Sequence, residues 1–167
     1  MTRLTLSLPM ARAFRAGLKT QTRRVSPPKF NVGDVVAIAE PCTVSLSFTP
    51  NLGVFVRCDY AAGGWKHTID EAEITRCATM PTVINRTPRG ARYMPGWAER
   101  SRIRITEIRE ERLGDITEAD AVREGFADRA AFLAYFASID DRVPVDRLRT
   151  LADLTLPVWV VSFEVVT

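Results

Sequence analysis

The stretch from Gly17 to Arg24, Gly-Leu-Lys-Thr-Gln-Thr-Arg-Arg, carries an amine, two hydroxyls and two guanidinium groups. It directly follows an amphipathic segment at residues 9–18, at a point where the chain must turn, and a hydrophobic core needs no such composition. Functional residues concentrate in loops that follow rigid elements. Lys19 could act as a base or a phosphate ligand, Thr22 as a nucleophile, and Arg23 and Arg24 as anion ligands.

The spacing of these residues leaves alternatives open. Lys19 and Thr22 share a face if the segment is helical, but they oppose each other if it is extended. A turn at the helix end, which Gly17 makes possible, is needed to bring the two side chains together. Lys19 could otherwise neutralise a helix C-terminus, and Thr22 could be an ordinary strand residue.

The cations of the chain are almost all arginine and are unevenly distributed. The sequence contains 20 arginines and 3 lysines, for a net charge of +3. Residues 1–30 carry no acidic side chain, and residues 86–104 carry six arginines against one acid, Glu99. Arginine binds phosphate bidentately and stacks on bases, so this distribution favours a basic face for a phosphate-bearing ligand. An arginine-rich surface without a ligand is the alternative for any single residue.

Several classes of protein are disfavoured by composition. Cys42, Cys58 and Cys77 are widely spaced and form no CxxC pair, so a disulfide framework or a structural zinc site is not expected. His67 is the only histidine, and nothing near it completes a catalytic triad or a metal site. No apolar run is long enough to cross a bilayer, and the first ten residues do not resemble a signal peptide. We therefore expect a cytoplasmic protein without a membrane partner.

Hydrophobic patterning predicts short strands with a few helices. Thr117 is expected to cap a helix that ends at Gly125, and Asp128 to cap a second helix with an apolar stripe. Residues 78–98, rich in Pro, Arg, Met and Gly, are predicted to form a long irregular loop. The strands are expected at residues 2–7, 35–39, 43–48, 54–60, 101–109 and 158–166, with a first helix at 9–18.

Three sets of residues together resemble a known family. Gly17, Lys19, Thr22 and Arg24 fit a G-x-K-x-x-[E/T]-x-R motif after the first helix. The other two are the strand start Gly33-Asp34-Val35-Val36 and the run from Glu111-Arg112-Leu113 through Ile116 to Asp120-Ala121-Val122-Arg123-Glu124-Gly125. In order and spacing these segments resemble the ASCH-domain family of the PUA-like superfamily. With Tyr93-Met94-Pro95-Gly96-Trp97-Ala98, they resemble in particular the ASCH proteins of phages and prophages, over most of residues 5–165.

The resemblance implies a mixed α+β fold: a small PUA-like β-barrel with a cleft, peripheral helices and a long loop insertion. It implies one ASCH/PUA-like domain over residues 1–167, with an elaborated loop at about 78–98 and a helical insertion at about 117–139. Small amidohydrolases that share the motif convert acetylcytidine to cytidine and acetate. The chain is longer than these enzymes, with an inserted region near residues 40–98 and a second helix near 128–139.

The resemblance also assigns roles. Lys19, Thr22 and Glu124 fall on the catalytic positions of a hydrolase that uses neither a metal nor a cofactor. The alternative is a PUA-like RNA-binding module or a single-strand ribonuclease with a basic cleft. The partner would be RNA, a modified nucleoside or single-stranded nucleic acid, and the protein a monomer or a weak dimer. The expected ligand-binding residues are Thr20, Arg23, Arg24, Arg92, Tyr93, Trp97 and Arg100.

Overall fold

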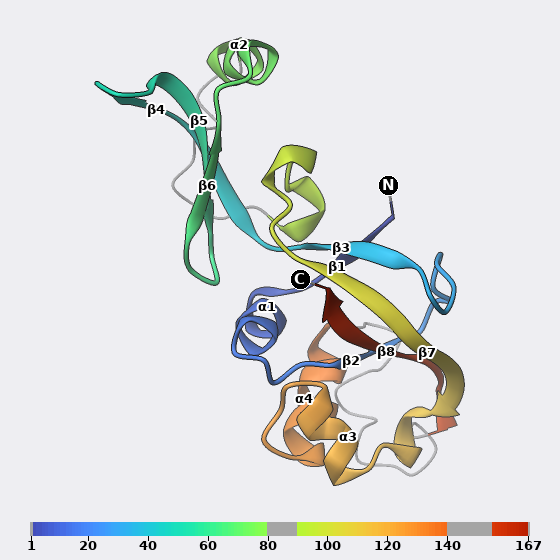
Figure 1. The fold of residues 1–167 in the computed structure, drawn as a ribbon. Helices are drawn as coiled ribbons and strands as arrows, with labels where there is room; N and C mark the ends of the chain where they lie inside the picture. Colours follow the sequence, from blue (N-terminus) through green and yellow to red (C-terminus); the bar gives the residue numbers. More distant parts are fainter. Residues whose placement is uncertain (1, 80–89, 140–154, 167) are drawn as a thin grey trace. The chain divides into compact units, whose positions relative to one another are not determined.

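A computed structural model describes residues 2–79, 90–139 and 155–166 of the chain (Figure 1). Within these residues the protein has a mixed α+β fold with a five-stranded sheet, a three-stranded sheet and four α-helices. The chain divides into two compact units. The first unit contains Met1–Thr2, Arg12–Val36 and Arg102–Thr167, and the second contains Arg3–Ala11 and Ala37–Ser101.

The five-stranded sheet is built on two long antiparallel strands of the first unit. β7 (Arg102–Arg112) pairs with β8 (Pro157–Val166), and β8 pairs in turn with the short strand β2 (Gln21–Arg24). Val158, Val160 and Val161 of β8 are fully buried, as expected for β-branched residues in a central strand. The five-stranded sheet has the strand order β1-β3-β7-β8-β2. The predicted strands at 101–109 and 158–166 are therefore confirmed, whereas β2 was not predicted as a strand.

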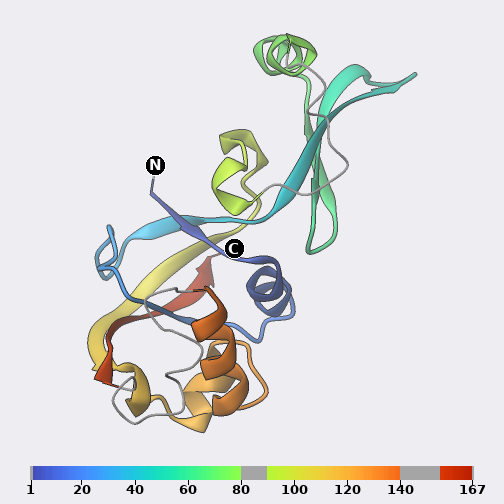
Figure 2. The same cartoon turned by 180° about the vertical axis from the view of Figure 1, so that it is seen from behind.

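Two helices lie side by side in the first unit, α3 (Glu118–Arg123) and α4 (Arg129–Ile139), as both views show (Figures 1 and 2). Thr117 caps α3 as predicted: its side chain accepts a hydrogen bond from the Asp120 amide, and the Asp120 carboxylate accepts one from the Thr117 amide. The apolar stripe of α4 forms a core with β8 through Phe132, Phe136 and Val158. Its role is packing, as its spacing indicated.

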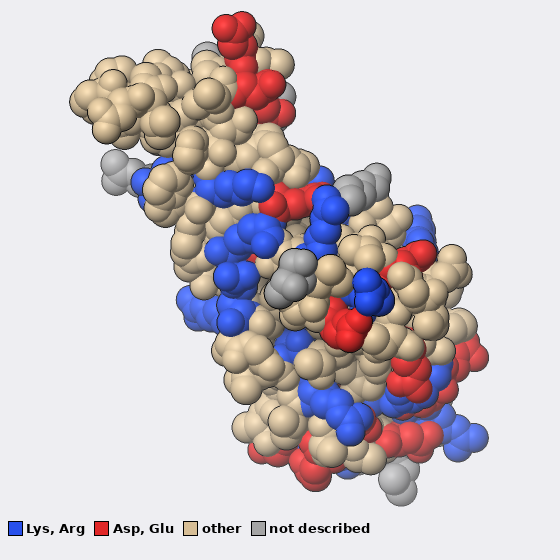
Figure 3. Space-filling view, viewed as in Figure 1, with Lys and Arg blue, Asp and Glu red and all other residues tan. Residues whose placement is uncertain are grey.

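The second unit contains the three-stranded sheet, with strand order β4-β5-β6. β4 (Cys42–Thr49) and β5 (Gly53–Tyr60) cover the strands predicted at 43–48 and 54–60 and form a hairpin, with Phe48 opposite Val54. β6 (Trp65–Thr68) pairs with β5. The unit also includes β1 (Arg3–Thr5), α2 (Glu71–Thr79) and two short 3₁₀ helices, η1 (Ala91–Tyr93) and η2 (Gly96–Ala98). The acidic side chains of α2 gather on one side of that helix in Figure 3.

The predicted loop at 78–98 is only partly described. Residues 80–89 lie outside the described residues, and the remainder includes the end of α2 and both 3₁₀ helices. Ala91, Met94 and Ala98 are buried in a core with Cys42 and Cys58. Both cysteines are buried thiols inside that core.

Two elements contribute residues to both units, α1 (Leu8–Arg15) and β3 (Val35–Ala39). Both were expected from the sequence, although α1 ends before Gly17, whose φ of +73° is a conformation that favours glycine. The mixed α+β class is thus confirmed, and the PUA-like barrel and the single-domain organisation stay predictions. None of the described helices is both long and apolar enough to span a membrane.

The capping box of α3 gives a first prediction. Replacing Thr117 with Ala removes the acceptor for the Asp120 amide, so we expect a loss of about 1 kcal/mol in the free energy of unfolding. Urea denaturation measures this loss. Val122→Ala, an exposed change on the same helix, is the control and should shift stability by less than about 0.5 kcal/mol. Equal effects of both changes would contradict a stabilising role for the cap.

Candidate functional site

Lys19 and Glu124 form a buried ion pair in the first unit. The Lys19 amine lies 2.7 Å from Glu124 Oε2, and the two side chains are 1% and 2% exposed. The amine also donates to the carbonyl oxygens of Gln21, at 2.7 Å, and Glu124, at 3.0 Å. It thus has three acceptors, the number that an ammonium group can satisfy. Two of the three predicted catalytic residues, 105 positions apart in sequence, are therefore in direct contact.

The local backbone explains how this contact forms. The Thr20 amide donates to the carbonyl of Arg123 at 2.9 Å, which ties the chain before β2 to the end of α3. Glu124 is the C-cap of α3, and Gly125 follows with a φ of +92°. A Cβ on Gly125 would lie 2.5 Å from the Ala13 Cβ and 3.6 Å from the Lys19 Cβ. Glycine is required at this position because the chain turns and passes very close to α1 there.

Arg23 links the pair to a wider set of charges. Its side chain is fully buried, and Nη1 lies 3.2 Å from Glu124 Oε1. Nε donates to Glu111 Oε1 at 2.7 Å, and Nη2 lies 2.6 Å from the same oxygen and 3.5 Å from Asp120 Oδ2. The guanidinium carbon lies 5.8 Å from the centre of the Phe132 ring. Arg23, predicted to contact a ligand, instead contacts three carboxylates of its own chain.

Burial sets the proton affinity of Lys19. Desolvation lowers the pKa of Lys19 from its ordinary value of 10.5, and this effect outweighs the attraction of Glu124, which raises it. Arg24 and Arg23 lower the pKa further because a second positive charge nearby disfavours the ammonium form. A lysine with a lowered pKa is available as a base closer to neutral pH than a free lysine.

Thr22, the third predicted catalytic residue, is buried in β2 opposite Val161. Neighbouring strand residues point to opposite faces, so its side chain leaves β2 on the face opposite to that of Arg23. Among the described residues, no hydrogen bond joins the Thr22 hydroxyl to Lys19 or Glu124. Thr20, predicted to bind ligand, is exposed and is held through its backbone, whose carbonyl accepts from the Phe163 amide.

Arg24 lies at the end of β2 and is partly buried. Desolvation lowers the pKa of Arg24 from its ordinary value, and the carboxylate of Glu124 acts in the opposite direction. Arginine keeps its charge at neutral pH despite such a shift. Arg24 therefore adds a second positive charge to the surroundings of Lys19 and Glu124.

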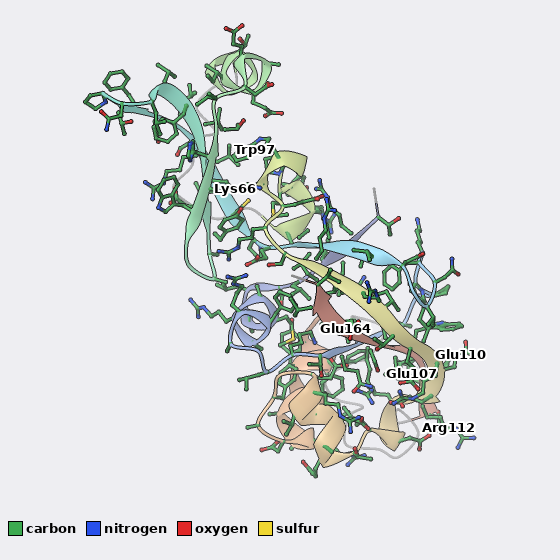
Figure 4. All side chains as sticks on the ribbon, in the orientation of Figure 1. Lys66, Trp97, Glu107, Glu110, Arg112 and Glu164 are labelled. Carbon is green, nitrogen blue, oxygen red and sulfur yellow. The ribbon has the colours of Figure 1, made fainter. Side chains whose placement is uncertain are left out.

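The other predicted ligand-binding residues belong to the second unit. Tyr93 is 61% exposed, and the Arg92 guanidinium carbon lies 6.0 Å from the centre of its ring. Trp97, labelled in Figure 4, is partly buried against the core of the unit, and its indole nitrogen has no hydrogen-bond partner among the described residues. Arg100 is held by Glu40 through two hydrogen bonds of 2.9 and 2.7 Å. Tyr93 is thus the accessible aromatic side chain of this set.

Some of the cations expected to form a basic face are paired with carboxylates, among them Arg3 and Arg104. Acidic and basic side chains alternate around α3, α4 and β7 in Figure 3. Many of the arginines form ion pairs with carboxylates. The pairs include Arg3 with Glu99, Arg57 with Asp59, Arg104 with Glu164, Arg109 with Glu107, and Arg123 with Asp120.

Sequence reasoning missed three residues of the site. Glu111 and Asp120 were seen as parts of a family motif but not as site residues, and Gln21 was not singled out. Gln21 is fully buried, and its side-chain oxygen accepts from Arg23 at 3.4 Å. The alternation of β2, which places Gln21 and Arg23 on one face, is the signal that could have indicated their contact. Within the described residues, no three His, Cys, Asp or Glu side chains are grouped as they would be around a metal ion.

Comparison with known proteins gives no relative. No family model, no curated protein and no solved structure matches the chain.

The close packing at Gly125 gives a second prediction. Gly125→Ala should lower the free energy of unfolding, because it combines the backbone strain of a positive φ, about 1–2 kcal/mol, with the clash against Ala13. Gly33→Ala is a matched control, since Gly33 has a φ of +93° and nothing within 4 Å of a new Cβ. Urea denaturation should therefore show a larger loss at position 125. Equal losses would show that strain alone acts there.

Proposed function

We propose that this protein is a metal-free hydrolase of an acylated nucleoside, of the acetylcytidine amidohydrolase type, and a member of the ASCH family with a PUA-like barrel. The observation that carries the proposal is the buried contact of 2.7 Å between Lys19 and Glu124. These two residues occupy the motif positions of a lysine and a glutamate in that family. A structural ion pair needs no such burial, and burying both charges is costly unless they are well compensated.

In the proposed reaction Lys19 is the general base. As a neutral amine it takes the proton of the Thr22 hydroxyl while Oγ bonds to the acyl carbon. The carbon–nitrogen bond of the amide then breaks, and the Lys19 ammonium returns the proton to the leaving nitrogen. This yields free cytidine and an acyl ester on Thr22. This step requires the Thr22 hydroxyl to come within hydrogen-bond reach of Lys19 in the substrate complex, a contact that is not formed among the described residues.

The second half of the reaction returns the enzyme to its starting state. A water molecule attacks the ester carbon and gives a proton to Lys19 or Glu124. The bond between that carbon and Thr22 Oγ then breaks, and the same proton passes to Oγ, which restores the threonine hydroxyl and leaves acetic acid, which ionises to acetate. Glu124 keeps the Lys19 amine oriented throughout, since it accepts from it through both a carboxylate and a carbonyl oxygen. Arg24 or a backbone amide near Gly17 stabilises the negative charge that develops on the acyl oxygen.

An RNA-binding module is the second candidate. It is favoured by the exposed rings of Tyr93 and Trp65, each with an arginine guanidinium near its face, at 6.0 Å for Arg92 and 4.8 Å for Arg57. Exposed aromatic side chains beside cations can stack on the bases of a single strand. Single-strand ribonuclease activity would require the same contacts and the Lys19 site.

The hydrolase proposal predicts the behaviour of two variants. Lys19→Met should abolish the release of cytidine from acetylcytidine, measured by chromatography, because the base is lost. Thr22→Val preserves the shape of the side chain but removes the nucleophile, so it should also abolish release.

Circular dichroism of both variants is the control for folding. Full activity of a folded Lys19→Met variant would refute the role of Lys19. If Thr22→Val is active and Lys19→Met is not, water attacks the substrate directly with Lys19 as its base. If the wild-type protein releases no cytidine, the RNA-binding module becomes the better candidate.

The lowered pKa of Lys19 predicts how the reaction rate and the stability depend on pH. The neutral amine is the working form, so the rate should rise with pH through the lowered pKa of Lys19, and the rising limb should lie below 10.5. In the window between the lowered pKa and 10.5 the unfolded chain binds more protons than the folded one. Stability should therefore also rise with pH there. A pH–rate profile and urea titrations at several pH values measure both effects, and a rate that does not change across this window would contradict the base role.

A further inference from the structure

The Arg23 guanidinium is shared among three carboxylates that come from different parts of the first unit. Glu111 lies on β7, Asp120 on α3, and Glu124 at the end of α3. The contacts are unequal. Glu111 Oε1 lies 2.6 and 2.7 Å from two nitrogens of the guanidinium, whereas the contacts to Glu124 and Asp120 are 3.2 and 3.5 Å. Glu111 is therefore the main anchor of Arg23.

The Glu124 carboxylate is shared in turn between two cations. Oε2 accepts from Lys19 and Oε1 from Arg23. The negative charge that stabilises the Lys19 ammonium is therefore the same charge that Arg23 attracts. The attraction that Glu124 exerts on Lys19 therefore depends on how strongly the other carboxylates neutralise Arg23. Glu111 supplies most of that neutralisation, because its carboxylate lies closest to the guanidinium.

We propose that Glu111 is a positioning residue that holds Arg23 in place beside Glu124. Glu111 thereby determines how readily the Lys19 ammonium gives up its proton. The inference rests on the proposed function for its catalytic meaning, because there Lys19 is the base. The coupling between Glu111 and Lys19 is a property of the folded protein alone and can be measured without any substrate.

Losing the Glu111 charge has two effects on the Lys19 ammonium, and both favour the loss of its proton. Arg23 would be left with one excess positive charge close to Lys19, which disfavours the ammonium form. Arg23 would also draw Glu124 more strongly, which weakens the ion pair of Lys19. The charged groups in these surroundings come from three elements: Arg23 and Arg24 of β2, Asp120, Arg123 and Glu124 of α3 and its C-cap, and Glu111 and Arg109 of β7.

The test is a titration of the lysine side chains by nuclear magnetic resonance with ¹⁵N-labelled lysine. The sequence contains only Lys19, Lys29 and Lys66, so three Nζ signals are expected and Lys19→Met assigns one of them. In Glu111→Gln the Lys19 signal should titrate at lower pH than in the wild-type protein. The other two lysines should titrate alike in both proteins and serve as internal references.

Glu110→Gln is the matched control. It removes the same charge from the next position of β7, where the side chain is exposed and, by strand alternation, points to the other face (Glu110 is labelled in Figure 4). It should leave the Lys19 titration unchanged because water screens an exposed charge. An unchanged midpoint in folded Glu111→Gln, or an equal shift in both variants, would overturn the proposal.

Asp120→Asn is a second variant for the case in which Glu111→Gln does not fold. It should move the Lys19 midpoint in the same direction but less, because Asp120 lies farther from Arg23, and no shift would count against the proposal. In a catalytically active protein the rising limb of the pH–rate profile should move with the titration. A structural defect would only lower the rate at every pH. A shift in the titration without any cytidine release would refute the hydrolase and leave the coupling established.

Discussion

The burial of the Lys19 ammonium beside Glu124 is the constraint on which the first unit depends. Both side chains are almost completely removed from water, and the desolvation of two charges is repaid only if the remaining hydrogen-bonding capacity is also satisfied. The chain meets this condition with two backbone carbonyls for the amine and with Arg23 for the second carboxylate oxygen. The ion pair is therefore one part of a compensated charge cluster.

That cluster places demands on the fold around it. Two carbonyls can point at one amine only if the chain before β2 is tied to the end of α3, which the Thr20 to Arg123 hydrogen bond achieves. The approach requires a glycine after Glu124. The cluster also requires a third element, β7, which places Glu111 beside Arg23. The result is a cluster in which Lys19 pairs with Glu124, and Arg23 pairs with Glu111, Asp120 and Glu124.

Sequence reasoning could predict the local parts of this arrangement but not their assembly. The cap at Thr117, the turn at Gly125 and the strand at 158–166 are determined by neighbouring residues, and each was predicted. The role of Arg23 depends on residues about 90 to 100 positions away, so its identity as a buried cation could not follow from its basic surroundings. The motif suggested Lys19 and Glu124 as partners, whereas only the fold could bring them to 2.7 Å.

The state of Lys19 reflects a competition between burial and hydrogen bonding. Burial favours the neutral amine, whereas three acceptors around Nζ favour the ammonium, because a neutral amine has only two hydrogens to donate. Losing the proton therefore leaves a lone pair without a donor, facing one of these oxygens. Such a lone pair is satisfied by a new donor, and a hydroxyl that approaches with bound substrate can supply one. In the proposed hydrolase, a Lys19 that is satisfied as a cation and requires a donor once neutral would be suited to accept a proton only when the reacting group is in place.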